Sequence, residues 1–467
     1  MPAEVVLSPG DTAWLLVSSA LVLLMTPGLA FFYGGLNRSK SVLNMMMMSF
    51  ASIGLISILW LFYGFTVAFG TDQPIGDTPG FWGDLGQYLG TKVLADEMAF
   101  PPFPATPIPT YVIMAFQMMF AIITVALISG AVSDRTKFAG WLVFAAGWFT
   151  LAYLPIAHMV WGGGFIGGKI GALDFAGGSA VHINAGAAAL ALAIILGRRV
   201  GWPRENFKPH NVPLVALGAG LLWFGWFGFN AGSELTADAI TAVAFINTQV
   251  ATAAALLGWI FVEWIKNRKP TMVGASSGAV AGLVAITPAC AYIAPYAAVL
   301  LGLVAGSVCA LAVSVKYRLG FDDSLDVVGI HFVGGWIGCL WIGFFATVQA
   351  DGGAYVKNEG LVYGGGADQL WAQFQGAGIV SIWSFVIALV VGYLVKVTIG
   401  FRVKREAELE GIDIAEHAES GYDFVPSGGS SSNGGSAFAL AGIGGGTTPQ
   451  AAPEPAPEVK PSQPANV

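Results

Sequence analysis

Residues 171–197 read GALDFAGGSAVHINAGAAALALAIILG, which places a histidine inside a nearly continuous apolar run. About 20 mostly apolar residues are enough for a helix to cross a membrane. An ionisable side chain at membrane depth is costly, so it usually marks a transport path or a proton relay. A second histidine, His331, lies in the apolar stretch 327–347. We therefore take His182 and His331 as the first candidate functional residues.

The composition of the whole chain supports a membrane location. Of 467 residues, 55% are hydrophobic and 10% are charged, whereas soluble chains carry roughly 25% charged residues. This composition predicts an all-α polytopic membrane protein, and the apolar runs of sufficient length predict eleven transmembrane helices. The expected spans are 12–33, 42–69, 110–131, 139–160, 179–197, 212–231, 241–265, 273–289, 295–315, 327–347 and 376–400.

The positive charges between these spans predict an orientation. Sixteen Lys and Arg residues fall in one set of connections and three fall in the other. Because cytoplasmic loops carry the excess of Lys and Arg, we expect the N-terminus outside and the C-terminus in the cytoplasm. The expected location is the cell (plasma) membrane, as a multi-pass protein.

The two histidines belong to a pattern that occurs twice, 149 residues apart. Because five helices per copy is an odd number, two five-helix copies must be inverted relative to each other. We predict repeats at about 10–200 and 210–350, followed by a last helix at 376–400. The matched pairs are Asp174 with Asp323, His182 with His331, and Gly186 with Gly335.

Three parts of the chain are expected. Residues 1–400 form the transmembrane domain, 401–424 a cytoplasmic segment, and 425–467 a disordered tail rich in Gly, Ser and Pro. The acidic, proline-rich stretch 70–109 is expected to be an ordered extracellular loop, and a short helix within it is left open.

Aromatic residues gather at the expected outer ends of three helices. Phe116 and Phe120 are four residues apart and share one helix face, as do Phe229 and Ser233. Trp161 ends another helix at the same level. Aromatic rings and a hydroxyl group can hold a small cation. The alternative is an ordinary belt of interfacial aromatic residues, and the sequence leaves both interpretations open.

Depth along the helices predicts an order from the outside: the aromatic residues, then His182, then His331. A neutral imidazole has one donor and one acceptor nitrogen, so two adjacent rings can share and pass a proton. Asp174, at the start of the His182 helix, either attracts cations or accepts hydrogen bonds from the helix start. The second role is the one we expect.

The sequence contains no pattern that indicates a metal, a cofactor or enzymatic catalysis. The three cysteines, Cys290, Cys309 and Cys339, lack metal-ligand spacing, and their odd number argues against a disulfide framework. HExxH and a GxSxG motif with a partner base are also absent. We expect no cofactor, no metal and no nucleic-acid partner, and we do not expect an enzyme.

Taken together, these segments closely resemble the ammonium transporter family (the Amt/Mep group, distant relatives of Rh proteins), and in particular its bacterial members. The resemblance covers most of residues 10–420, and its DFAGGSAVHIN run is highly specific. The other matching segments are TPGLAFFYGGL (26–36), AHMVWGGG (157–164), WFGFNAGS (226–233), FINTQVATAAALLGWI (245–260), GAVAGLVAITPAC (278–290) and DVVGIH (326–331).

The resemblance implies a function and a site. Ammonium would be recruited outside and deprotonated, and ammonia would then cross an apolar pore with return of the proton. It implies homotrimers in the inner membrane that serve nitrogen metabolism, with methylammonium as a substrate analogue. The implied residues are Phe116, Trp161 and Ser233 for recruitment, Phe120 and Phe229 for a phenyl gate, the pore histidines His182 and His331, and Asp174 in a structural or electrostatic role.

The segment FRVKREAELEGIDIAEHAESGYDF (401–424) resembles the regulatory C-terminus of the family, which binds a PII signalling protein in many bacterial members. One departure is His-Ala-Glu at 417–419, where the family often has His-Gly-Glu. Three other functions compete with ammonium transport: a neutral-gas or urea-type facilitator like the Rh branch, an ammonium sensor, and an intramembrane enzyme.

Overall fold

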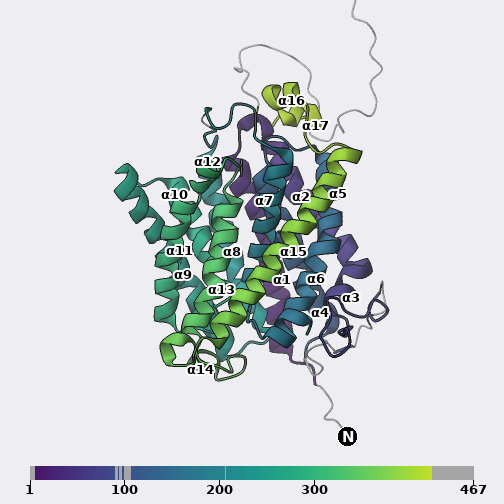
Figure 1. Ribbon diagram of the computed structural model, residues 1–467, viewed down its shortest axis with the longest axis vertical. Helices are drawn as coiled ribbons and strands as arrows, with labels where there is room; N and C mark the ends of the chain where they lie inside the picture. The colour runs from purple at the N-terminus through teal and green to yellow at the C-terminus, as the bar shows by residue number, and fades with distance from the viewer. Residues whose placement is uncertain (1–5, 90–92, 94–96, 99–106, 206, 423–467) are drawn as a thin grey trace, which may run out of the picture. The chain divides into compact units, whose positions relative to one another are not determined.

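The structure is a computed structural model that describes residues 6–89, 93, 97–98, 107–205 and 207–422. Within these residues the regular structure is helical, and β-type contacts are limited to four isolated bridges (Figure 1). The predicted all-α class is confirmed.

The long helices come in two series. The first half of the chain forms α1 (Pro9–Leu36), α2 (Val42–Leu59), α3 (Phe65–Phe69), α4 (Thr110–Ile128), α5 (Phe138–Trp148), α6 (Leu154–Trp161) and α7 (Asn184–Leu196). The second half forms α8 (Val212–Ala231), α9 (Ala239–Asn267), α10 (Met272–Ile286), α11 (Pro295–Ala312), α12 (Val315–Leu319), α13 (Val333–Phe345), α14 (Val348–Asp351) and α15 (Asp368–Thr398). Two short helices follow, α16 (Arg405–Glu410) and α17 (Ile412–His417).

Several spans include a turn of π-helix, in which the backbone hydrogen bonds reach one residue further than in an α-helix. These turns are η2 (Trp60–Gly64), η4 (Phe149–Tyr153), η5 (Phe165–Ile170), η6 (Gly178–Ile183) and η8 (Val328–Phe332). Both candidate histidines lie in such turns, His182 in η6 and His331 in η8. Because π-helical turns are frequently found at functional sites, this placement singles out both positions.

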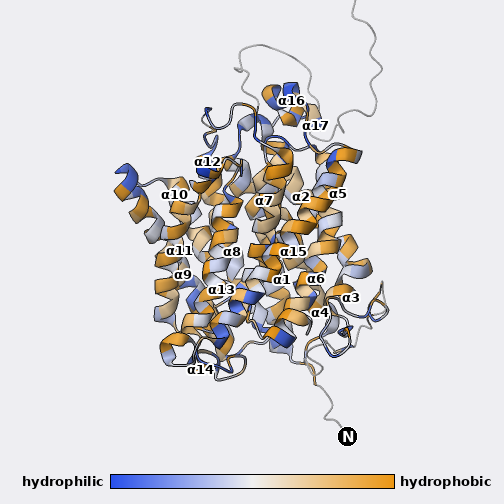
Figure 2. Ribbon diagram, in the orientation of Figure 1, coloured by the Kyte–Doolittle hydropathy of each residue, from blue (hydrophilic) through white to orange (hydrophobic). Residues whose placement is uncertain are grey.

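All eleven apolar stretches that were expected to span the membrane are helical. Ten helical segments of the described chain are long and apolar enough to cross a membrane. The eleventh expected span, 273–289, corresponds to α10, which is apolar but ends at Ile286, where the chain continues in turns to Tyr292. Figure 2 shows that apolar residues dominate along the helices, with hydrophilic residues concentrated toward their ends.

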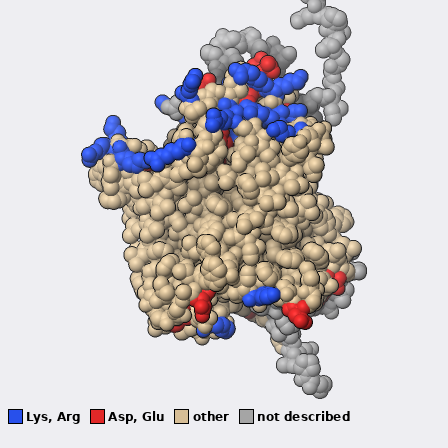
Figure 3. All heavy atoms as spheres, viewed as in Figure 1, with Lys and Arg blue, Asp and Glu red and all other residues tan. Residues whose placement is uncertain are grey.

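Lys and Arg gather at one end of the helices, beside α12, α16 and the connections near them (Figure 3). Few Lys or Arg residues are visible at the other end, where the described N-terminal residues lie. This asymmetry is the one on which the predicted orientation rests.

Small residues let the helices approach closely. Helices α1 and α8 pack along each other, and a Cβ atom added at Gly218 of α8 would lie 2.2 Å from the backbone nitrogen of Phe32. In the same way, a Cβ atom at Gly302 of α11 would lie 2.1 Å from the carbonyl oxygen of Ala251 in α9. Glycine therefore brings these backbones together, as is typical of helix pairs in membranes.

The last long helix, α15, packs along both α7 and α13, which continue the two histidine-bearing turns. The Ser384 hydroxyl of α15 donates a hydrogen bond of 2.7 Å to the carbonyl oxygen of Asn184, directly after η6. This final helix thus stabilises the part of the molecule that holds the histidines.

Two expectations about the connections have different outcomes. In the described part of 70–109 the backbone forms turns, bends and two isolated bridges, and the short helix that the sequence left open does not occur there. Glycines at tight turns and polar contacts, such as that of Asp72 with His158 at 2.8 Å, fix this part of the loop instead. The predicted disordered tail, 425–467, lies outside the described residues.

Residues 401–422 pack against the end of the bundle that is rich in Lys and Arg. The Asp413 carboxylate accepts hydrogen bonds from the backbone N–H groups of Leu43 (3.0 Å) and Asn44 (2.8 Å) at the start of α2. Ala418, at the departure from the family pattern, ends α17 with φ of 52°. That left-handed conformation favours glycine, which explains the residue that the family often has there.

Candidate functional site

The two histidines lie in the first turns of their spans and meet inside the helical bundle. Their Nδ1 atoms are 3.2 Å apart, and the ring centroids are 5.3 Å apart with an interplanar angle of 25°. Both side chains are buried. The pairing that their repeated sequence context predicted is therefore present in the structure.

Two glycines let the histidine-bearing helices cross this closely. A Cβ atom added at Gly186 would lie 2.6 Å from backbone and side-chain atoms of Phe332, and one at Gly335 would lie 3.2 Å from the backbone nitrogen of Ile183. Ile183 and Phe332 are themselves 149 residues apart, the offset of the sequence repeat. The crossing is thus reciprocal: Gly186 contacts Phe332, and Gly335 contacts Ile183, which is the residue that corresponds to Phe332 in the first copy of the repeat.

An aspartate accepts hydrogen bonds at the start of each histidine-bearing turn. Asp174 accepts five hydrogen bonds of 2.6–3.0 Å, from the backbone of residues 177–180 and the Ser179 hydroxyl. Asp323 accepts two, from the backbone N–H groups of Val327 (3.1 Å) and Val328 (2.7 Å). In both turns the carboxylate satisfies helix-start donors that would otherwise be buried without partners.

Aromatic rings connect the histidine pair to one end of the protein. The ring of His182 stacks on Trp226 at 5.4 Å, and Phe229 follows at 6.2 Å. Phe229 in turn stacks on Phe120, with centroids 4.2 Å apart and an angle of 23°. The two phenyl rings therefore lie next to the histidine pair, and Trp161 is edge-on to Phe120 at 6.1 Å.

Beyond the phenyl rings lies a cavity of about 770 Å³, which we call the vestibule. Three predicted recruitment or gate residues line it: Phe120, Trp161 and Ser233. The Ser233 hydroxyl donates to the carbonyl oxygen of Phe229 (2.7 Å), so its oxygen can still accept a hydrogen bond from a cation. The indole N–H of Trp161 donates to the backbone oxygen of Asp174 (2.8 Å), which fixes the ring at the wall.

The predicted recruitment residue Phe116 is not among the residues that line the vestibule. It is fully buried and packs edge-on against Phe120, with ring centroids 4.9 Å apart. Phe116 therefore packs against the phenyl pair without facing the vestibule.

The vestibule also contains residues that the sequence reasoning missed. Glu234 lines it, directly after Ser233, and its carboxylate accepts a hydrogen bond from the Tyr355 hydroxyl at 3.1 Å. Burial, together with the negative charge of Glu234, raises the pKa of Tyr355, so this phenol remains a donor. A carboxyl group at the end of an apolar helix was a usable signal for Glu234. Tyr355 lies in a loop without any motif.

On the other side of the phenyl rings is a small cavity of about 10 Å³ beside the histidines. This volume corresponds to about one water-sized molecule. The two histidines are the only titratable residues in its wall, which is otherwise apolar. The lining residues are Met25, Leu29, Phe32, Ile123, Leu127, His182, Leu222, Trp226, Phe229, Val280 and His331.

Within the described residues, no group of three or more His, Cys, Asp or Glu side chains is arranged to hold a metal ion. The three cysteines are free and buried. The chemistry available beside the histidines is therefore proton exchange by two imidazoles in an apolar wall, next to a polar and aromatic vestibule.

Comparison with known proteins agrees with this architecture. The Ammonium Transporter Family profile matches residues 13–422. An ammonium transporter of Mycobacterium tuberculosis is 54% identical over 437 residues, which covers 90% of this chain and 92% of the relative. The crystal structure of Saccharomyces cerevisiae Mep2 is similar with a TM-score of 0.78 and 33% identity, covering 86% and 88% of the two chains.

A structure described as a sensor Amt protein is also similar, with a TM-score of 0.77 and 27% identity over 87% of this chain and 98% of the other. The family match covers most of the chain, and the relatives are named as ammonium transporters, not as enzymes. We conclude that this multi-pass membrane protein belongs to the ammonium transporter family.

Proposed function

We propose that the protein takes up ammonium across the plasma membrane, with the vestibule as the outer entrance. Ammonium would bind there, lose a proton next to the phenyl pair, and continue as ammonia past the two histidines. The observation that carries the proposal is the position of the imidazole pair. It lies in an otherwise apolar wall, directly behind two stacked phenyl rings.

The vestibule has the chemistry that a small cation needs. The rings of Trp161 and Phe120 can attract a cation by about 1–2 kcal/mol each once water is displaced. The oxygen of Ser233 can accept one of its hydrogen bonds, and Glu234 adds a carboxyl group to the wall. Such a site suits recruitment and release more than tight binding.

Beyond the phenyl pair, the environment favours ammonia over ammonium. A cavity of about 10 Å³ has no room for a hydration shell, and a bare ion in an apolar wall pays a large desolvation penalty. A neutral molecule avoids this penalty. Potassium would be excluded, because it has no proton to lose and would have to enter the apolar cavity as a bare ion.

The histidine pair can carry the proton that ammonium loses. One of the two Nδ1 atoms donates to the other, so in a neutral pair one Nε2 atom is a donor and the other Nε2 atom is an acceptor. A proton accepted at one end and released at the other reverses both rings without moving the side chains. Proton and ammonia would then travel along the same wall.

Orientation, assembly and regulation are part of the proposal. The excess of Lys and Arg at one end supports a cytoplasmic C-terminus. The resemblance to the family supports a homotrimer and a PII-type regulatory protein on residues 401–424. It also supports a role in nitrogen metabolism at the inner membrane.

The decisive experiment measures electrical currents from the protein reconstituted in liposomes. Ammonium and methylammonium should produce currents, and potassium should produce none. Replacing His182 or His331 by leucine should reduce the ammonium current by about 100-fold, the scale of a lost acid–base group. His210→Asn is the matched control, because His210 contacts the Asn37 carbonyl and Tyr422 and does not line the cavity beside the pair.

Each other outcome points to a different function. Flux of ammonia without any ammonium current would indicate a neutral-gas facilitator. Binding of ammonium without flux of either species would indicate a sensor. Unchanged current and selectivity in both leucine variants would refute the role of the histidines as a relay.

A further inference from the structure

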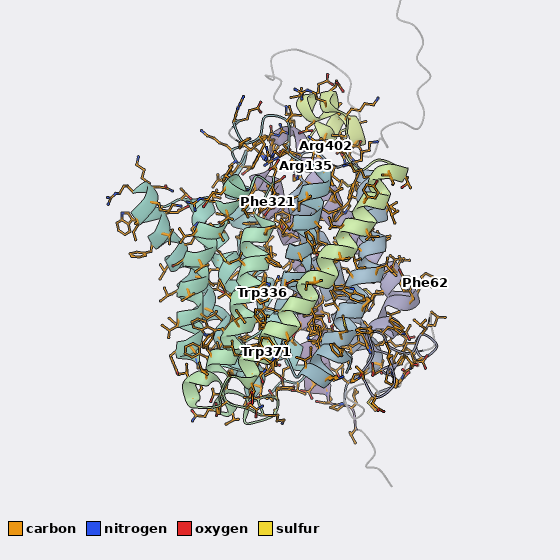
Figure 4. The ribbon with its side chains drawn as sticks, viewed as in Figure 1. Phe62, Arg135, Phe321, Trp336, Trp371 and Arg402 are labelled. Carbon is orange, nitrogen blue, oxygen red and sulfur yellow. The ribbon has the colours of Figure 1, made fainter. Side chains whose placement is uncertain are left out.

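A further cavity, of about 470 Å³, lies at the end of the molecule that is rich in Lys and Arg. Its walls come from the connection after α7 and from the segment around α16. Figure 4 labels Arg402 at this end, with Arg135 nearby. The lining residues are Arg198, Arg199, Val200, Gly201, Arg402, Arg405 and Glu408.

One of the four arginines is already neutralised. Arg199 is buried and donates from Nε and Nη2 to the two carboxylate oxygens of Asp322, each at 2.9 Å. Burial alone would raise the pKa of Asp322, but the hydrogen bonds and charges of Arg199 and Arg135 hold it below its usual value. Arg199 therefore fixes the back wall and contributes little free charge.

A second arginine shares its charge with the only carboxylate in the wall. Arg402 donates from Nη2 to Glu408 at 2.6 Å, and its Nη1 atom donates to the backbone oxygen of Leu196 at 2.9 Å. Glu408 is buried and also accepts from the backbone N–H of Val200. The carboxylate thus links α16 to the connection after α7, and both of its oxygens are engaged.

The remaining two arginines have no carboxylate partner in the part of the chain that the structure describes. Arg198 donates from Nε to the carbonyl oxygen of Gly320 (2.8 Å) and lies over the ring of Trp202. Arg405 is exposed at the start of α16. Two of the four arginines that line the cavity, Arg198 and Arg405, thus have no carboxylate partner among the described residues, whereas Arg199 also contacts Asp134 at 3.3 Å.

We propose that this cavity binds a phosphate group, which bridges the connection after α7 to α16. Arginine suits phosphate because its planar guanidinium offers parallel N–H donors, and the guanidinium groups of Arg198 and Arg405 are not engaged by a carboxylate of the described residues. Two sources present this chemistry: a free phosphorylated solute and the headgroup of an anionic phospholipid. In either case the bound phosphate would hold α16 against the bundle.

The test uses the full-length protein in a neutral detergent. Inorganic phosphate is titrated at constant ionic strength, with chloride as the compensating anion, and binding is measured by calorimetry. The double variant Arg198→Gln/Arg405→Gln removes the two unpaired charges, and both side chains are exposed, so folding should be unaffected. We expect saturable binding to the wild type and an affinity at least about tenfold lower for the double variant.

Lys404→Gln is the matched control, since Lys404 is exposed, precedes Arg405 and does not line the cavity. It should bind phosphate like the wild type. A parallel arm uses nanodiscs of phosphatidylcholine with and without phosphatidic acid, with amide hydrogen exchange in α16 as the readout. Protection by phosphatidic acid that the double variant loses would identify a lipid headgroup as the source.

Saturable binding of inorganic phosphate alone, lost in the double variant, would identify a free solute. The proposal is overturned if neither probe binds, or if the double variant and the wild type respond equally to both. Ammonium current is not a readout here, so a failure of this proposal leaves the proposed transport function untouched.

Discussion

The two histidine-bearing turns are alike at their centre and different at their ends. In the middle they share a π-helical turn, a crossing glycine and one ring of the imidazole pair. At its start, the first turn is held by five hydrogen bonds to Asp174, which also lines the vestibule. The second is held by two hydrogen bonds to Asp323.

Among the described residues, a cation hydrogen-bonds at the second end and not at the first. The ammonium group of Lys316 donates to the backbone oxygen of Asp323 and to the carboxylate of Asp326, each at 2.7 Å. At the first end, Asp174 has backbone N–H groups and one hydroxyl as donors. The crossing therefore fixes the imidazole pair, while the two ends differ: Asp174 borders the vestibule, and Lys316 hydrogen-bonds at the end that holds Asp323.

The largest expected effect comes from replacing Asp174, which accepts more hydrogen bonds than Asp323 does. In Asp174→Asn an amide NH₂ group would face backbone N–H groups, so at least two buried donors lose their acceptor, each at about 1–3 kcal/mol. We expect the free energy of unfolding to fall by about 3–5 kcal/mol. Denaturant titration in mixed micelles measures it.

The comparison variant is Asp323→Asn, where one of two hydrogen bonds is lost and the expected decrease is about 1–2 kcal/mol. Equal losses in the two variants would show that the two ends are equivalent, contrary to this interpretation.

A smaller effect is expected at the crossing. In Gly186→Ala the new methyl group would lie 2.6 Å from the backbone of Phe332, so the two helices must separate. We expect a loss of about 2–3 kcal/mol in the free energy of unfolding, together with a reduced ammonium current as the imidazoles move apart.

Gly220→Ala in α8 is the matched control, because a Cβ atom there has nothing within 4 Å. This variant should be unchanged or slightly more stable, since alanine favours a helix more than glycine does. If Gly186→Ala behaved like this control, the close crossing would not be what sets the distance between the histidines.

The smallest expected effect is a change of the free energy of unfolding with pH, and it arises from Asp323. Burial raises the pKa of Asp323 to about 6 from 3.8, although Lys316 acts in the opposite direction. The folded protein therefore binds this proton more tightly than the unfolded chain. The resulting stabilisation is complete below pH 3.8 and is lost as the pH rises to about 6.

The wild type should thus lose about 1–2 kcal/mol relative to Asp323→Asn between pH 4 and pH 6. Unfolding of both proteins at closely spaced pH values measures this difference. An identical pH dependence of the two would show that Asp323 is ionised in the folded protein throughout this range.

Much of the fold could be predicted because a helix that spans a membrane needs about 20 mostly apolar residues, which are visible in the sequence. Each apolar stretch of sufficient length is helical in the structure, and the repeated aspartate, histidine and glycine positions predicted which helices meet. The loop 70–109 was less predictable: its described residues form turns, bends and isolated bridges. Polar and glycine-rich loops are fixed by tertiary contacts, which have no periodic signal.

The site was predicted less completely than the fold. Motif residues such as Trp161 and Ser233 line the vestibule, but Phe116 lies behind the phenyl pair, because spacing along a helix gives a face and not the neighbour that covers it. Tyr355 reaches Glu234 from a distant loop, and no sequence pattern links the two.

The helical membrane class, the apolar spans and the two candidate histidines could be read from the sequence alone. This is possible because hydrophobic length and costly buried charge are local properties of the chain. Helix packing, in contrast, sets the 3.2 Å contact between the imidazoles, the size of the cavity beside them and the arginine-lined cavity near α16. Those features depend on how closely distant backbones pack, and the side chains that set this distance come from different helices.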